Sequence, residues 1–242
     1  LVFVLCREPL EWLLELSAPD CNFGADPGTC RHIKSVAQCW LVLVEKCSEN
    51  SPSWLPGECS LQANDLEAHA NATHGKLSAD EVSGYLTYIL HGYEHLPQWI
   101  AFLQAAKPSG EGDSLGIGEV KKIQTFMDIV YKRELPAAFG YLPFGQMYQA
   151  ASFAGREQFP GDCWDLLQNF CHEFAGQGCD RNISDYTGAQ FAVHRDQVLS
   201  HPRATYARLL ETARAKDCRN GIPHGKPTSY YQGVVFERTW HI

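Results

Sequence analysis

Several apolar runs of the chain end in polar side chains that could bind a ligand or move a proton. The four that we predict to bind a ligand are Arg7, Gln104, His194 and Arg195. Arginine can grip a phosphate or carboxylate with two parallel hydrogen bonds, glutamine can both donate to and accept from a sugar hydroxyl, and histidine changes charge near neutral pH. For Arg195 the alternative is an ion pair with a nearby Asp or Glu.

Three further residues are candidates for acid–base chemistry. Glu237 and His241 belong to the sequence Glu-x-x-Trp-His, and on a helix their four-residue spacing would place both on one face. A carboxylate and an imidazole there could share one proton, or could simply form an ion pair at a helix end. Glu81 is either a buried acid at a cleft or, three residues after Ser78, part of a capping box.

The sequence gives little support for a resident metal ion. No Asp-x-Asp pair occurs in the chain, and the closest imitation, Glu-Gly-Asp at 111–113, lies in a Gly-rich stretch typical of a solvated turn. His91 and His95 have the four-residue spacing of two helical metal ligands, but the pattern supplies no third ligand. We therefore predict no metal site.

The elements that must position these residues alternate between strands and helices. Continuous apolar runs predict buried strands at 1–5, 40–46, 99–104 and 189–194. Apolar residues at helical spacing predict helices at 9–16, 78–96, 117–133, 163–174 and 202–215. The segment 229–242 is ambiguous between strand and helix.

This alternation predicts an α/β fold: a mostly parallel central sheet flanked by helices. We expect one domain over residues 1–242, with insertions at 17–38 and 48–76. Ligands of such sheets bind outside the carboxyl ends of the strands, so the polar strand ends should gather at one edge.

Composition excludes some functions. The net charge of −8 and the lack of any basic run longer than two residues disfavour a nucleic-acid partner. No apolar run reaches the length of a membrane span. The stretch 1–16 carries acidic residues and no basic start, so we interpret it as a strand and a helix and not as a secretory signal.

Cysteine usage points to the secretory pathway. The chain has ten cysteines and no Cys-x-x-Cys pair, and sequons at Asn71 and Asn182 are candidate glycosylation sites. We expect a secreted, disulfide-tied glycoprotein; the alternative is a reduced protein with buried thiols.

Two long motifs carry a family resemblance. "YLTYILHGYEHLPQWIAFLQ" (85–104) and "GAQFAVHRDQVLSHPRATYARLL" (188–210), with "CREPLEWL" near the start and "FERTWH" near the end, resemble domain of unknown function family 3431. The layout of that family is similar to glycosyltransferases of the GT-A type, which bind nucleotide sugars. Two departures are notable: an Asn-x-Gly-x-Glu motif of the family is Leu77-Ser78-Ala79-Asp80-Glu81 here, and the Gly-Asp pair expected after Gln104 is replaced by Ala-Ala.

Two functions follow from the resemblance. The first is a secreted, non-catalytic glycosyltransferase-like domain that serves as a binding or structural subunit, with protein subunits or glycans as partners. The second is an active glycosyltransferase-like enzyme using a nucleotide-sugar donor, with Mn²⁺ or Mg²⁺ as cofactor. The missing Asp-x-Asp favours the first.

Overall fold

The fold is described from a computed structural model of the whole chain. The structure describes residues 1–5, 39, 41–46, 55, 57–63, 81–104, 117–132, 140–144, 148–151, 162–175, 183–186 and 190–215. The predicted helix at 9–16 and the segments 17–38 and 229–242 lie outside the described residues.

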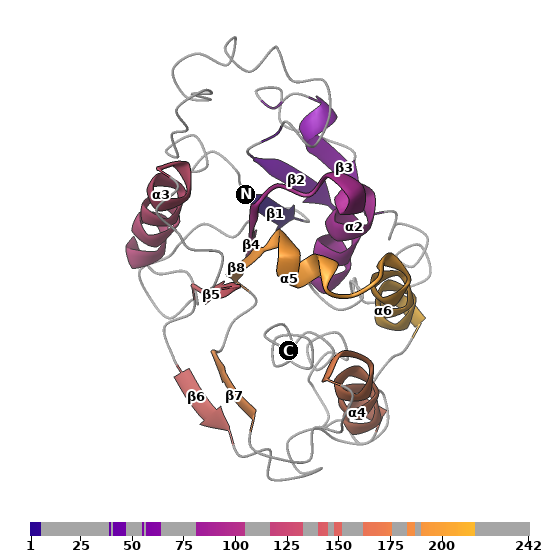
Figure 1. Ribbon diagram of the computed structural model, residues 1–242. Coiled ribbons are helices and arrows are strands. Elements are labelled where there is room, and N and C mark those ends of the chain that lie inside the picture. Colours follow the sequence, from indigo (N-terminus) through magenta and orange to yellow (C-terminus); the bar gives the residue numbers. More distant parts are fainter. Residues whose placement is uncertain are drawn as a thin grey trace.

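A six-stranded sheet forms the centre of the molecule (Figure 1). Its order is β3 (Ser60–Gln62), β2 (Val42–Glu45), β1 (Val2–Leu5), β4 (Trp99–Gln104), β8 (Phe191–His194) and β5 (Tyr141–Pro143). The first four strands are parallel to one another, whereas β8 runs antiparallel to both β4 and β5. The prediction of an α/β fold is confirmed, but the sheet is mixed and not mostly parallel.

A separate antiparallel pair, β6 (Tyr148–Ala151) and β7 (Ile183–Tyr186), lies away from the six-stranded sheet, in the lower part of Figure 1. The apolar runs of the sequence predicted neither of these strands, nor β3 and β5. The predicted insertion 48–76 contains β3, so this segment contributes a strand to the central sheet.

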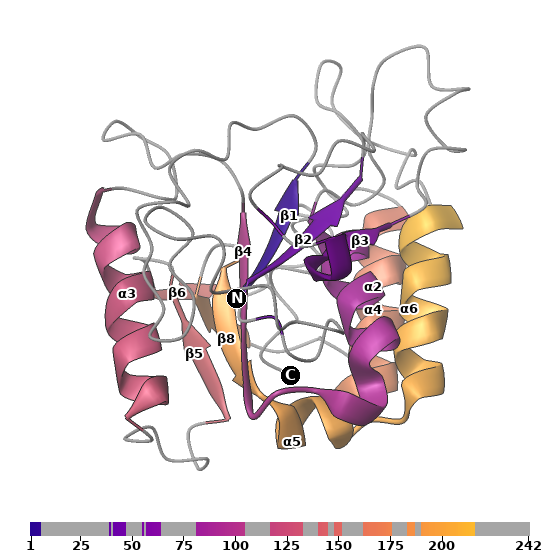
Figure 2. The same ribbon diagram turned by 90° about the horizontal axis from the view of Figure 1, so that it is seen from above.

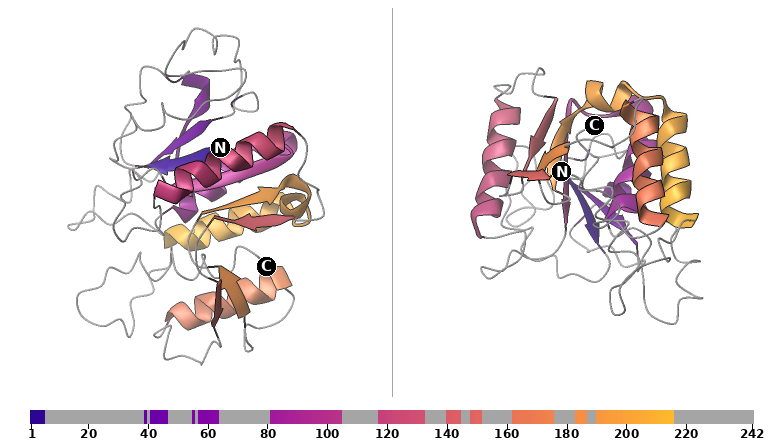
Figure 3. Two further views of the ribbon diagram at one scale, coloured as in Figure 1. Left: turned by 90° about the vertical axis from the view of Figure 1, so that its left-hand side faces the viewer. Right: turned by 90° about the horizontal axis from the view of Figure 1, so that it is seen from below.

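Helices cover both faces of the six-stranded sheet, as Figure 2 shows. On one side lies α3 (Ile117–Tyr131), and on the other lie α2 (Val82–Gly92), α6 (Arg203–Ala215) and α4 (Asp162–Ala175). The views in Figure 3 show the same layers from two further directions. All four helices were predicted from their apolar spacing, with ends that differ by a few residues.

The strands divide their side chains between the two helical layers because successive residues of a strand point to opposite faces. In β1, Val2 and Val4 pack in the core under α2 and α6, while Phe3 packs in the core on the α3 side. Strand β4 alternates in the same way, with Ile100 and Phe102 on the first side. Continuous apolar runs were therefore a correct sign of strands buried on both faces.

Helix α6 buries one face, and the spacing of its apolar residues determines which face that is. Its buried residues Tyr206, Leu209, Leu210 and Ala213 follow the spacing of one helical face. That face meets α2, whose own buried face includes Tyr85, Leu86 and Ile89. The short helix α5 (Arg195–Leu199), which the sequence analysis did not predict, joins β8 to α6.

One disulfide ties the β2 side of the sheet. Cys39, shortly before β2, is bonded to Cys59, directly before β3. Cys171, on α4, is also disulfide-bonded, and no cysteine among the described residues is free. The expected disulfide ties are thus present in this part of the chain.

Candidate functional site

The carboxyl edge of the parallel strands is the first candidate site. From β1 the chain adds β2 and then β3 on one side, and afterwards places β4 on the other side of β1. The order therefore reverses between β1 and β4. In open α/β sheets, a ligand binds outside the carboxyl ends of the strands at such a reversal, because the loops leaving the two strands diverge there.

Val4 shows which predicted residues share this edge. Its backbone pairs in register with Gln104, the last residue of β4. Its side chain lies against Gly84 in the first turn of α2, because a methyl group on Gly84 would be 2.4 Å from Val4 Cγ2. Glu81, which directly precedes α2, therefore lies at the same edge as Gln104. These two candidates thus share the carboxyl edge of the sheet.

Glu81 occupies a different helix position from the one expected. The capping box placed it in the first turn of a helix starting near Ser78, but α2 begins at Val82 and Glu81 is its N-cap residue. The Glu81 carbonyl accepts a hydrogen bond from the Tyr85 N–H, and its side chain makes no capping hydrogen bond. Ser78 lies outside the described residues.

Two charged residues at the end of β2 were missed as candidates. Glu45 and Lys46 are each only 1% exposed. Charged groups are buried at this level only when they are paired or hydrogen-bonded, and the Ser60 hydroxyl donates a 2.6 Å hydrogen bond to Glu45 Oε1. The signal that could have found them is the one used elsewhere: polar residues that end an apolar run.

Glu45 and Lys46 also stand close to the reversal. Glu45 pairs in register with Leu5, the last residue of β1, and with Gln62 of β3. The ends of three neighbouring strands therefore meet around one buried carboxylate. The Glu45–Ser60 hydrogen bond joins β2 to β3 at this edge.

His194 and Arg195 lie at the opposite edge of the sheet. Because β8 is antiparallel to β4, His194 pairs with Trp99, the first residue of β4, and not with its last residue Gln104. The Arg195 N–H donates to the Gln98 carbonyl at 2.9 Å, just before β4 begins. The expectation that all the polar strand ends gather at one edge is therefore wrong for β8.

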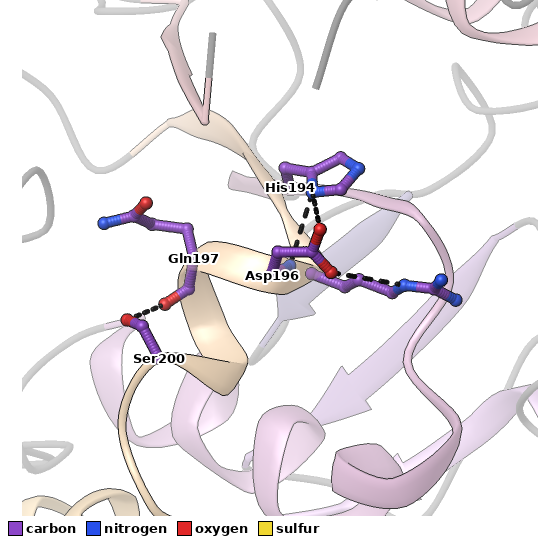
Figure 4. A network of polar contacts seen from close by, with 5 residues as sticks. His194, Asp196, Gln197 and Ser200 are labelled. Atoms are coloured by element: carbon purple, nitrogen blue, oxygen red, sulfur yellow. Dashed lines mark hydrogen bonds and ion pairs between the residues drawn. The ribbon is translucent and has the colours of Figure 1, made fainter. Parts of the chain in front are cut away.

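The side chains at this second edge form a small network (Figure 4). His194 Nδ1 accepts a 3.3 Å hydrogen bond from the Asp196 N–H and lies 3.5 Å from Asp196 Oδ2. Arg195 is half exposed, and its Nε lies 3.7 Å from Asp196 Oδ1. The ion pair considered as the alternative for Arg195 is thus present.

Histidine and tyrosine residues near this edge have shifted pKa values. Burial lowers the pKa of His201, although the Glu173 carboxylate opposes the shift. Burial raises the pKa of Tyr206, and burial raises that of Tyr88 to about 12. Tyr206 donates a 2.7 Å hydrogen bond to the Val198 carbonyl, so its hydroxyl serves the packing of α5 on α6.

A metal centre is not supported within the described ranges, which contain no group of three or more His, Cys, Asp or Glu side chains that could hold an ion. His91 and His95 are both exposed, at the end of α2 and in the short 3-10 helix η5 (Tyr93–His95) that follows it. Glu111 and Asp113 lie outside the described residues. Similarly, no helix in the described part of the chain has the length and apolar character needed to span a membrane.

Five predicted site residues lie outside the residues that the structure describes. They are Arg7, Asn71, Asn182, Glu237 and His241. Their assignments stay predictions. Arg7 comes two residues after Leu5, the last residue of β1, and Asn182 directly precedes β7.

The second edge lies in the part of the chain that matches a known family. Residues 149–242 match the family model described as Protein of unknown function (DUF3431). This part of the chain is similar to that family. The DUF3431 match includes the predicted motif at 188–210 and the "FERTWH" sequence, while the motif at 85–104 lies outside it. No curated protein and no solved structure matches the chain.

Proposed function

We propose that the protein is a secreted, non-catalytic glycosyltransferase-like domain that binds a sugar or nucleotide-sugar ligand and acts as a binding subunit of an extracellular assembly. The reversal of strand order between β1 and β4 supports this proposal, because ligands of open α/β sheets bind at such a reversal and Gln104 and Glu81 both lie at this edge.

The residue types at the edge favour a ligand with many hydroxyl groups. An amide both donates and accepts hydrogen bonds, and a carboxylate accepts them from two oxygens, which suits the alternating donors and acceptors of a sugar. Arg7, which follows β1, is the residue that we assign to a phosphate or carboxylate of the ligand. His194 and Arg195 have no part in this site, since they lie at the other end of β4.

The lack of a suitable ligand set for a metal favours a binding role over catalysis. A metal-dependent transferase needs hard oxygen ligands, commonly an Asp-x-Asp pair, to neutralise the leaving diphosphate. The sequence contains no such pair, and the described residues do not supply another set. We therefore assign no reaction step to a metal ion.

An active enzyme remains the second candidate because of Glu237 and His241. Both belong to the stretch that matches the family model, and their spacing suits an acid–base pair. In that case a nucleotide sugar would be turned over, and Glu237→Ala and His241→Ala would each abolish turnover without abolishing ligand binding.

The secreted location is supported by the bonded cysteines. The Cys39–Cys59 bond and the bonded state of Cys171 suit an oxidising compartment, as do the two sequons.

Thermal unfolding with a ligand panel tests the proposal. The panel contains free monosaccharides, nucleoside diphosphates and nucleotide sugars, each with and without Mn²⁺. A ligand present at a hundredfold excess over its Kd stabilises the folded state by about 2.7 kcal/mol. We expect stabilisation that does not depend on Mn²⁺ and that Gln104→Ala and Glu81→Ala both reduce. Arg195→Ala, at the opposite edge, is the matched control and should leave it intact.

The possible results separate the candidates. No stabilisation by any member of the panel, or a loss caused only by Arg195→Ala, contradicts a ligand site at the carboxyl edge. Release of nucleoside diphosphate from a donor would instead support the enzyme.

A further inference from the structure

We draw no further inference here: the strongest candidate, the side-chain cluster of Trp99, His194 and Phe126 between β4, β8 and α3, is buried in ring-to-ring contacts, and nothing in the described part of the chain shows a ligand or partner that would reach it.

Discussion

Gly84 and the Val4 side chain are in direct contact, so that helix α2 lies against strand β1 with only the Val4 side chain between them. A Cβ atom on Gly84 would lie 2.4 Å and 2.6 Å from the two methyl carbons of Val4. Valine cannot move these methyl groups easily, because its branched Cβ leaves few allowed rotamers. The glycine is therefore required by the close approach of the helix to the strand.

Gly84→Ala should destabilise the fold. Alanine is favoured over glycine in a helix by up to about 1 kcal/mol, but overpacking a core costs about 1–3 kcal/mol. We expect a lower free energy of unfolding, measured with urea, and recovery of part of the loss in the double variant Gly84→Ala/Val4→Ala. Gly92→Ala is the control, because the new Cβ would meet only Leu96 Cδ2, at an ordinary 3.5 Å. Equal stability of both alanine variants would contradict the contact.

Removing the Cys39–Cys59 bond should lower stability by about 3 kcal/mol, the loss predicted from chain entropy for a loop of this length. The double variant Cys39→Ala/Cys59→Ala is the suitable test, since a reducing agent would also break the bond of Cys171. Urea unfolding under oxidising conditions gives the difference from the wild type. An unchanged midpoint with an unchanged slope would argue against the bond.

Buried tyrosines should make the fold sensitive to alkali. The folded pKa of Tyr88 is about 12, above the ordinary value of 10.0, so its contribution to stability is complete below about pH 10 and is lost as the pH rises towards 12. Burial also raises the pKa of Tyr206, so Tyr206 too contributes stability that is lost at high pH. We expect the free energy of unfolding to fall between pH 9 and pH 11.5, and to fall less in Tyr88→Phe. The same fall in both proteins would rule out this role for Tyr88.

Glu173→Gln should lower the pKa of His201 further, because the carboxylate opposes the effect of burial. A folded pKa below the unfolded value of 6.5 means that the contribution of His201 to stability is present above that value and is lost as the pH falls. The imidazole resonances of His201 report the pKa directly. Glu211→Gln, which removes an exposed carboxylate from α6, is the control and should leave it unchanged.

The helices were predictable because their information is local. Tyr206, Leu209 and Ala213 repeat at helical spacing whatever they pack against, and they are buried as a stripe in α6. Strand β3 was missed for the opposite reason. It has only three residues, two of them polar, and it joins the sheet beside β2, where Ser60 meets Glu45, a partner fifteen residues away.

The direction of β8 could not be predicted from the pattern of apolar residues in the sequence. Phe191–His194 is buried on both faces, and such a run looks the same whether its neighbour is parallel or antiparallel. As a result, the residue types at the strand ends were recognised, but their grouping was not. Gln104 and Glu81 share an edge, while His194 lies with Trp99 at the other edge.

The antiparallel direction of β8 puts polar strand ends at both edges of the sheet. A molecule held beside the last residues of β1 and β4 and a second one touching the exposed start of α5 would stand on opposite ends of the sheet, so neither would obstruct the other.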